Sequence, residues 1–118
     1  MTRVFVELPI FCSKWKELKL SDGDLFRLQD IILSNAKIGP VIKETGGVRK
    51  MRFAFENKGK SGSVRVIYID FEEFEKVYLI TAYQKNEKAN LSKAEKNELK
   101  KLIALLEKQL KEKKGETK

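Results

Sequence analysis

The side chains best suited to act on a phosphodiester gather in the middle of this chain. Residues 43–65 carry seven Lys and Arg against two Asp and Glu. Six of these cations surround one glycine-rich segment: Arg49, Lys50, Arg52, Lys58, Lys60 and Arg65. Positive side chains held in fixed relation to one another bind the phosphates of RNA or DNA. We therefore expect this segment to contact a nucleic acid.

Arg65 is the most informative of these cations. Its neighbours Val64, Val66 and Ile67 are apolar, which is typical of a central strand. A guanidinium that is partly buried in such a strand needs an anion. The alternative, for Arg65 as for the other cations, is an exposed charge that keeps a sheet edge from aggregating.

Tyr83 and Lys85 lie near the end of a run rich in β-branched and aromatic residues, Val77 to Lys85. In a strand their side chains share one face, because the period is two. A tyrosine at a strand end can stack on a base, although tyrosines more often pack in a core. We include both residues in the candidate site.

The absence of histidine narrows the possible chemistry. Catalysis must use Lys, Arg, Tyr, Asp or Glu, since the commonest general base is missing. The single cysteine, Cys12, falls among core-facing residues, and we expect it to be a buried, inert thiol. We expect neither a metal site nor a cofactor. The string Gly59-Lys60-Ser61 fails as a phosphate-binding loop because Ala54 stands where that loop needs a glycine.

The overall composition indicates one folded domain with an anionic partner. The chain has 118 residues, 42% of them hydrophobic, and a formal charge of +8 at pH 7. No stretch of the sequence approaches the roughly 18 apolar residues of a membrane helix. We expect a cytoplasmic protein without a membrane partner.

Hydrophobic periodicity predicts an α+β fold. From Val48 onward Met51, Phe53 and Phe55 alternate with Lys50 and Arg52, which predicts a strand with one apolar and one cationic face. The other expected elements are a strand at 4–8, a helix from Pro9, a helix ending near Asn35, a loop at 56–63, strands at 64–71 and 77–85, and a helix opened by a Ser92–Glu95 capping box. Residues 1–112 form the single expected domain, and 113–118 a flexible polar tail.

The order of elements and four short stretches resemble the RelE/ParE superfamily of bacterial toxins, and within it the HigB-like branch. The stretches are FVE at 5–7, TGGVRKMR at 45–52, KGKSG at 58–62 with RVIY at 65–68, and YQKNE at 83–87. The resemblance covers residues 4 to about 100. It implies a RelE-like fold, in which a strand and two helices precede a three-stranded antiparallel meander and a C-terminal helix.

The resemblance further implies the toxin of a type II toxin–antitoxin system. Such a toxin is a ribosome-dependent mRNA endoribonuclease, or mRNA interferase, which inhibits translation and is silenced by a cognate antitoxin that itself binds DNA. Cleavage in the family needs no metal. A deprotonated 2′-hydroxyl attacks the adjacent phosphorus and expels the 5′-oxygen. We expect the isolated toxin to be a monomer.

Each candidate residue has an expected role under this resemblance. Lys50, flanked by Arg49 and Arg52, is the expected base, since neighbouring cations favour a neutral lysine. Arg52 and Arg65 hold the scissile phosphate. Tyr83 stacks on or orients a base. The remaining cations donate a proton to the leaving oxygen or contact RNA: Arg49, Lys58, Lys60 and Lys85.

Two other functions remain open on the sequence. Members of the ParE branch of the same fold are associated with poisoning DNA gyrase, and fold alone does not separate the branches. A non-catalytic RNA-binding module is the second alternative, and it would tolerate Lys50→Arg because the charge is kept. Glu56, Ser61 and Ser63 make the expected hairpin less basic than in many HigB-like chains, which predicts weaker RNA affinity.

Overall fold

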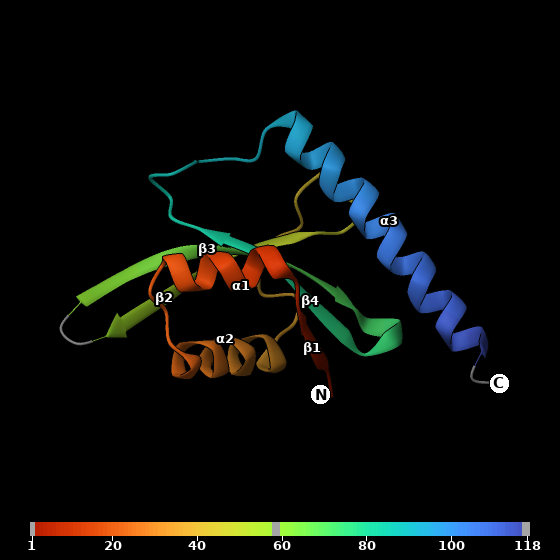
Figure 1. Ribbon diagram of the computed structural model, residues 1–118, viewed down its shortest axis with the longest axis horizontal. Helices are drawn as coiled ribbons and strands as arrows, with labels where there is room; N and C mark the ends of the chain where they lie inside the picture. Colours follow the sequence, from red (N-terminus) through yellow and green to blue (C-terminus); the bar gives the residue numbers. More distant parts are fainter. Residues whose placement is uncertain (1, 58–59, 117–118) are drawn as a thin grey trace.

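The computed structural model of this chain describes residues 2–57 and 60–116, and the side chains of all of these except residues 57, 60, 61 and 116. The elements are β1 (Val4–Glu7), α1 (Pro9–Glu17), α2 (Asp22–Ser34), β2 (Arg49–Asn57), β3 (Lys60–Phe71), a 3-10 turn η1 (Glu72–Phe74), β4 (Lys76–Tyr83) and α3 (Lys93–Glu116). The sheet order is β1-β4-β3-β2; β1 is parallel to β4, and the other pairs are antiparallel (Figure 1). The predicted α+β fold class is confirmed.

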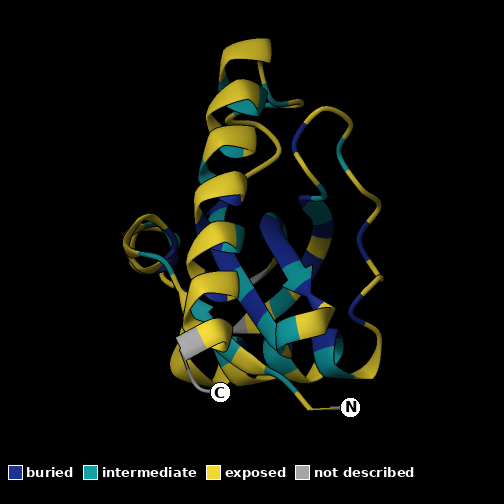
Figure 2. Cartoon of the chain, turned by 90° about the vertical axis from the view of Figure 1, so that its right-hand side faces the viewer, coloured by how far each residue is buried: buried dark blue, intermediate teal, exposed yellow. Residues whose placement is uncertain are grey.

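The sheet is covered on both faces, but unequally. Helices α1 and α2 pack on one face, where Phe11, Trp15 and Leu28 meet Phe53 and Val66. Helix α3 packs on the other face, and Figure 2 shows its outer side exposed with buried strand residues behind it. The β2–β3 hairpin extends away from α3 (Figure 1), so part of this second face is left uncovered.

The helices begin where local chemistry favours a beginning. Pro9 occupies the first position of α1. In α2 the Ser21 hydroxyl accepts from the Asp24 N–H at 3.1 Å, while the Asp24 carboxylate accepts from the Ser21 N–H at 2.9 Å. The expected Ser92–Glu95 capping box is confirmed with the same pair of bonds. No helix in the described parts of the chain is long and apolar enough to cross a membrane.

Three local expectations are wrong. The stretch 56–63 is not a loop, because Glu56 pairs with Ser61 and the two strands continue to the Asn57–Lys60 pair. Ser61, Gly62 and Ser63, which were expected in the loop, are paired strand positions in a polar hairpin arm. The last strand ends at Tyr83, so Lys85 lies beyond it. Cys12 is exposed, because it lies on the outer side of α1, one position along from the buried Phe11.

The C-terminal helix extends further than the sequence indicated. Helix α3 runs to Glu116 and so includes residues 113–116, which belong to the expected tail. Its last turn carries Lys113 and Lys114, and cations there interact favourably with the helix dipole. The division of the chain at residue 112 stays a prediction.

A buried tyrosine connects the long loop before β2 to the sheet. The Tyr68 hydroxyl accepts from the Gly39 N–H at 3.1 Å and donates to the Ala36 carbonyl at 2.8 Å. The Lys50 N–H donates to the Pro40 carbonyl at 3.1 Å. The loop thereby determines where β2 begins, and with it the position of the cationic face.

We expect Tyr68→Phe to lower the free energy of unfolding by about 1–3 kcal/mol, because two buried backbone groups lose their partner. Denaturant unfolding followed by circular dichroism measures the change. Tyr78→Phe is the matched control, since Tyr78 is only partly buried and keeps its ring contact with Phe71. Equal losses in the two variants would contradict this account of the loop.

Candidate active site

Three candidate side chains form a row across the face of the sheet on which α3 packs, from the exposed Arg52 to the buried Tyr83. Arg52 of β2 lies directly opposite Arg65 of β3, and Arg65 lies directly opposite Tyr83 of β4. Directly paired residues have Cβ atoms roughly 4.5–5.5 Å apart. Lys50 is two positions before Arg52 and so shares the same face. The register therefore brings together four of the five predicted catalytic residues.

Two atoms in this row are buried without a hydrogen-bond partner among the described residues. They are Nη1 of Arg65 and the hydroxyl oxygen of Tyr83. Buried polar groups are nearly always paired, and an unpaired one is costly. Two such groups on directly paired residues, beside a second arginine, make this row a candidate anion site.

The environment of Tyr83 keeps its hydroxyl protonated. Burial raises the pKa of Tyr83, while the charges of Lys88 and Arg65 act in the opposite direction and Glu95 raises it further. The side chain is 3% exposed. The hydroxyl therefore stays available as a neutral hydrogen-bond donor at physiological pH.

Lys88 and Glu95 lie next to Tyr83, on the side of the candidate site that faces α3. The Lys88 ammonium lies 5.6 Å from the centre of the Tyr83 ring, within cation–π range. Its other contact is a hydrogen-bonded ion pair with Glu95, which raises the pKa of Lys88 and lowers that of Glu95. Lys88 is thus a fixed positive charge beside Tyr83.

An apolar cavity of about 560 Å³ adjoins this corner. Tyr83 and Lys88 line it together with Ile10 of α1 and Leu99 of α3. The described residues contain no group of three or more His, Cys, Asp and Glu placed to hold a metal ion. The chemistry that the site offers is that of arginine, lysine and tyrosine side chains.

A family model described as the RelE toxin of the RelE/RelB toxin–antitoxin system matches residues 3–116. The chain belongs to the RelE toxin family. Its fold is similar to that of a mutant of the E. coli toxin RelE in the free state, with a TM-score of 0.51 and 14% sequence identity. That match covers 75% of this chain and 90% of the E. coli chain.

Family membership confirms the resemblance at the level of RelE toxins and implies an antitoxin as the partner of this chain. The HigB-like branch stays a prediction. At 14% identity the structural similarity shows a shared fold and assigns no residue roles.

Some predicted site residues of this RelE-family toxin lie away from the row. Arg49 faces the other side of β2, and its guanidinium donates to the Gly39 carbonyl at 2.8 Å, so it holds the preceding loop. Lys85 lies in the exposed turn after β4. Lys58 lies outside the described residues, and of Lys60 only the backbone position in β3 is described.

The sequence analysis missed one cation that the fold brings to the site and a second that the fold brings to the edge of β2. Lys88 approaches Tyr83 from the turn before α3, and Arg27 approaches β2 from α2. The Ser92–Glu95 capping box was recognised, yet nothing local indicates that Glu95 also pairs with Lys88. Arg27 is 27 residues from its partner Ala54, so no local pattern could reveal that contact.

If Arg65 Nη1 and the Tyr83 hydroxyl bind an anion, a simple inorganic anion should bind there in the absence of RNA. We expect sulfate, a stand-in for phosphate, to stabilise the protein by about 1 kcal/mol at five times its dissociation constant. That gain raises the melting temperature by about 3–5 °C relative to chloride at equal ionic strength.

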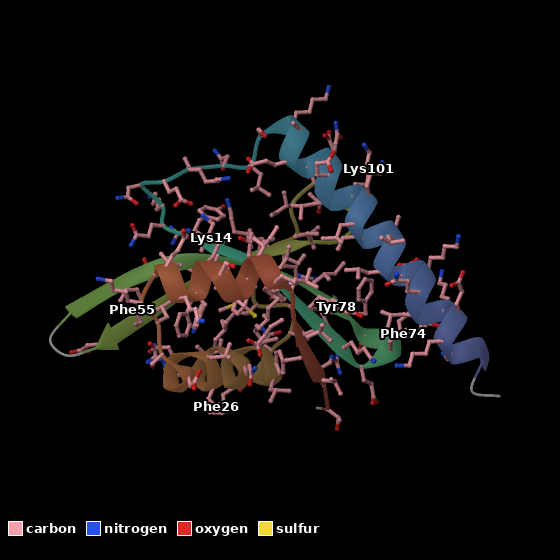
Figure 3. All side chains as sticks on the ribbon, viewed as in Figure 1. Lys14, Phe26, Phe55, Phe74, Tyr78 and Lys101 are labelled. Atoms are coloured by element: carbon pink, nitrogen blue, oxygen red, sulfur yellow. The ribbon has the colours of Figure 1, made fainter. Side chains whose placement is uncertain are left out.

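Because sulfate also stabilises proteins non-specifically, matched variants decide the test. Arg65→Gln should lose the sulfate-dependent gain, whereas Lys101→Gln, on the exposed face of α3 (Figure 3), should keep it. The same gain in Arg65→Gln as in the wild type would remove the anion site.

Proposed function

We propose that this toxin is a metal-independent endoribonuclease that cuts mRNA on the ribosome. The observation that carries the proposal is the Arg52–Arg65–Tyr83 row with its two unpaired buried atoms. A site for one oxyanion on a cationic sheet face matches a phosphodiester. Membership of the RelE toxin family supports the same conclusion.

The proposed reaction transfers the phosphoryl group within the RNA. Lys50, acting as the general base, takes the proton from a 2′-hydroxyl, and the resulting oxyanion attacks the adjacent phosphorus. The bond from phosphorus to the 5′-oxygen breaks, and a protonated lysine gives that oxygen its proton. The products are a 2′,3′-cyclic phosphate and a 5′-hydroxyl end, and no oxidant, metal or cofactor takes part.

Arg52, Arg65 and Tyr83 stabilise the charge that develops on the phosphorus oxygens. The two guanidinium groups and the Tyr83 hydroxyl are hydrogen-bond donors on three adjacent strands of a rigid sheet. Such preorganised donors contribute about 3–4 kcal/mol each to the transition state. Lys88 lies over the Tyr83 ring, so we assign Tyr83 a contact through its hydroxyl in place of base stacking. The proton donor to the leaving oxygen is among Lys58, Lys60 and Lys85.

The partners follow from the charge of the chain. With a net charge of +8, the toxin is attracted to ribosomal RNA as well as to mRNA. The antitoxin, which we expect to bind DNA, would silence the toxin by covering the cationic face with acidic side chains. We propose a cytoplasmic toxin that is monomeric when free of this partner.

Mapping of cellular mRNA 5′ ends before and after tightly controlled expression tests the nuclease. We expect new ends inside translated frames, and a loss of about 100- to 1,000-fold in Arg65→Ala. Lys101→Ala on α3 should cut like the wild type. Growth arrest without new ends would overturn the nuclease and favour a gyrase poison.

Conservative replacement of Lys50 separates catalysis from binding. We expect Lys50→Arg to bind RNA as the wild type does but to lose cleavage, because arginine keeps the charge and cannot act as a base. RNA binding by fluorescence anisotropy and cleavage on purified ribosomes are measured side by side. Full cleavage by Lys50→Arg would exclude Lys50 as the base.

A further inference from the structure

A second concave surface lies on the β2–β3 hairpin, next to the candidate active site. It is a polar pocket of about 490 Å³, lined among others by Arg27, Arg52, Ala54, Glu56 and Ser63. The Ala54–Ser63 pair follows the Arg52–Arg65 pair by two residues on the same face. Two residues advance a strand by roughly 6.6 Å. The pocket is therefore about one nucleotide away from the proposed phosphate position.

The pocket has room because its floor is made of small residues. Ala54 and Ser63 are directly paired, and Gly62 follows opposite Phe55. A Cβ at Gly62 would meet the Phe55 ring at 3.1 Å, on the face of the sheet opposite to the Ala54 and Ser63 side chains. Phe55 (Figure 3) packs against the core on the α1 and α2 side of the sheet. The volume falls in the range of small-ligand sites.

Arg27 is held in place at the rim of the pocket. Its Nη2 donates to the Ala54 carbonyl at 2.7 Å, and its guanidinium carbon lies 4.8 Å from the centre of the Phe53 ring. Its Nη2 also forms an ion pair with the Asp24 carboxylate at 3.9 Å, and the side chain is 45% exposed. A guanidinium has five N–H donors, so a partly exposed one fixed in this way retains donors for a phosphate.

Glu56 is the unexpected member of the pocket, because it brings a carboxylate into a lining that includes two arginines. It is exposed, shares the face of Arg52 and Ala54, and forms no ion pair within the described parts of the chain. A carboxylate repels phosphate and only accepts hydrogen bonds. Its natural RNA ligand is a base edge that offers N–H donors.

Guanine fits a carboxylate better than the other three bases do. Its Watson–Crick edge presents the N1–H and the N2 amino group side by side, so both carboxylate oxygens can accept at once. Adenine and cytosine each offer a single amino group on that edge. In uracil the N3–H lies between two carbonyl oxygens, which repel a carboxylate.

We propose that this pocket is a nucleotide subsite, in which Glu56 accepts from the Watson–Crick edge of a guanine and Arg27 binds the phosphate flanking that guanine. The subsite rests on the proposed function, because it selects RNA for the neighbouring active site. It explains an acid in a basic hairpin as a specificity-determining group. Single-stranded RNA is commonly read on such exposed base edges.

Binding of short RNA to the purified toxin tests the subsite directly. The probes are the fluorescent pentamers UUGUU, UUAUU and UUUUU, measured by anisotropy at fixed salt. We expect the guanine pentamer to bind about tenfold more tightly than the other two, and Glu56→Gln to remove most of that preference. Glu112→Gln, on the exposed side of α3, is the matched control and should keep it.

Arg27 has a separate signature in the same assay. Arg27→Gln should weaken all three pentamers by a similar factor and reduce the salt dependence, because a phosphate contact carries no base information. Arg27→Lys should restore part of the affinity. Circular dichroism of each variant shows that the fold is kept.

The outcomes separate the two proposals. A guanine preference that Glu56→Gln removes, without cleavage of mRNA, would support the subsite and overturn the nuclease. Cleavage by the wild type with equal binding of the three pentamers, or with a guanine preference that Glu56→Gln leaves intact, would overturn the subsite. A guanine preference lost in Glu56→Gln, together with a guanine beside the mapped cuts, would support both.

Discussion

The register of β3 between its two neighbours is the constraint on which the site depends. β3 is paired with β2 and β4, and its side chains enter both cores: Val64 and Val66 face α1 and α2, whereas Ile67 and Ile69 face α3. A slip of one residue would turn every one of these side chains to the wrong face and would put Arg65 into the α1–α2 core. The apolar residues therefore fix the arginine, although none of them takes part in the chemistry.

The fold holds the site in place, although charges within the site repel one another and two of its polar atoms lack hydrogen-bond partners. Two arginines directly opposite one another repel, and Nη1 of Arg65 and the Tyr83 hydroxyl are buried without partners in the described structure. Ile103, Leu106 and Leu110 of α3 cover the neighbouring part of the same face, so the unfavourable contacts sit beside a well-packed cluster. Local conflict of this kind, surrounded by consistent packing, is expected at functional sites. An oxyanion between these groups would relieve it.

The sequence was informative where the relevant physics is local. Alternation along β2 correctly separated Lys50 and Arg52 from the buried Met51 and Phe53, because strand periodicity depends only on neighbouring residues. The same periodicity places Arg49 on the opposite face from the site. Grouping Arg49 with the other cations of residues 43–65 did not take this face into account. Contacts between residues far apart in the chain could not be predicted from the neighbouring sequence. The approach of Lys88 to Tyr83 depends on how α3 docks, and strand pairing beyond Glu56 depends on hairpin geometry that polar residues specify weakly.

Charge explains why an acid can be useful on the cationic hairpin. Attraction between lysine or arginine and phosphate is the same for every RNA sequence, so adding cations increases affinity without increasing selectivity. A carboxylate at Glu56 weakens that attraction for all sequences and is compensated only when a base supplies N–H donors to it. The difference between matching and non-matching RNA therefore grows while the overall affinity falls. Under the proposed function, a net charge of +8 already attracts the toxin to RNA, so selectivity beside the scissile phosphate adds more than further attraction would.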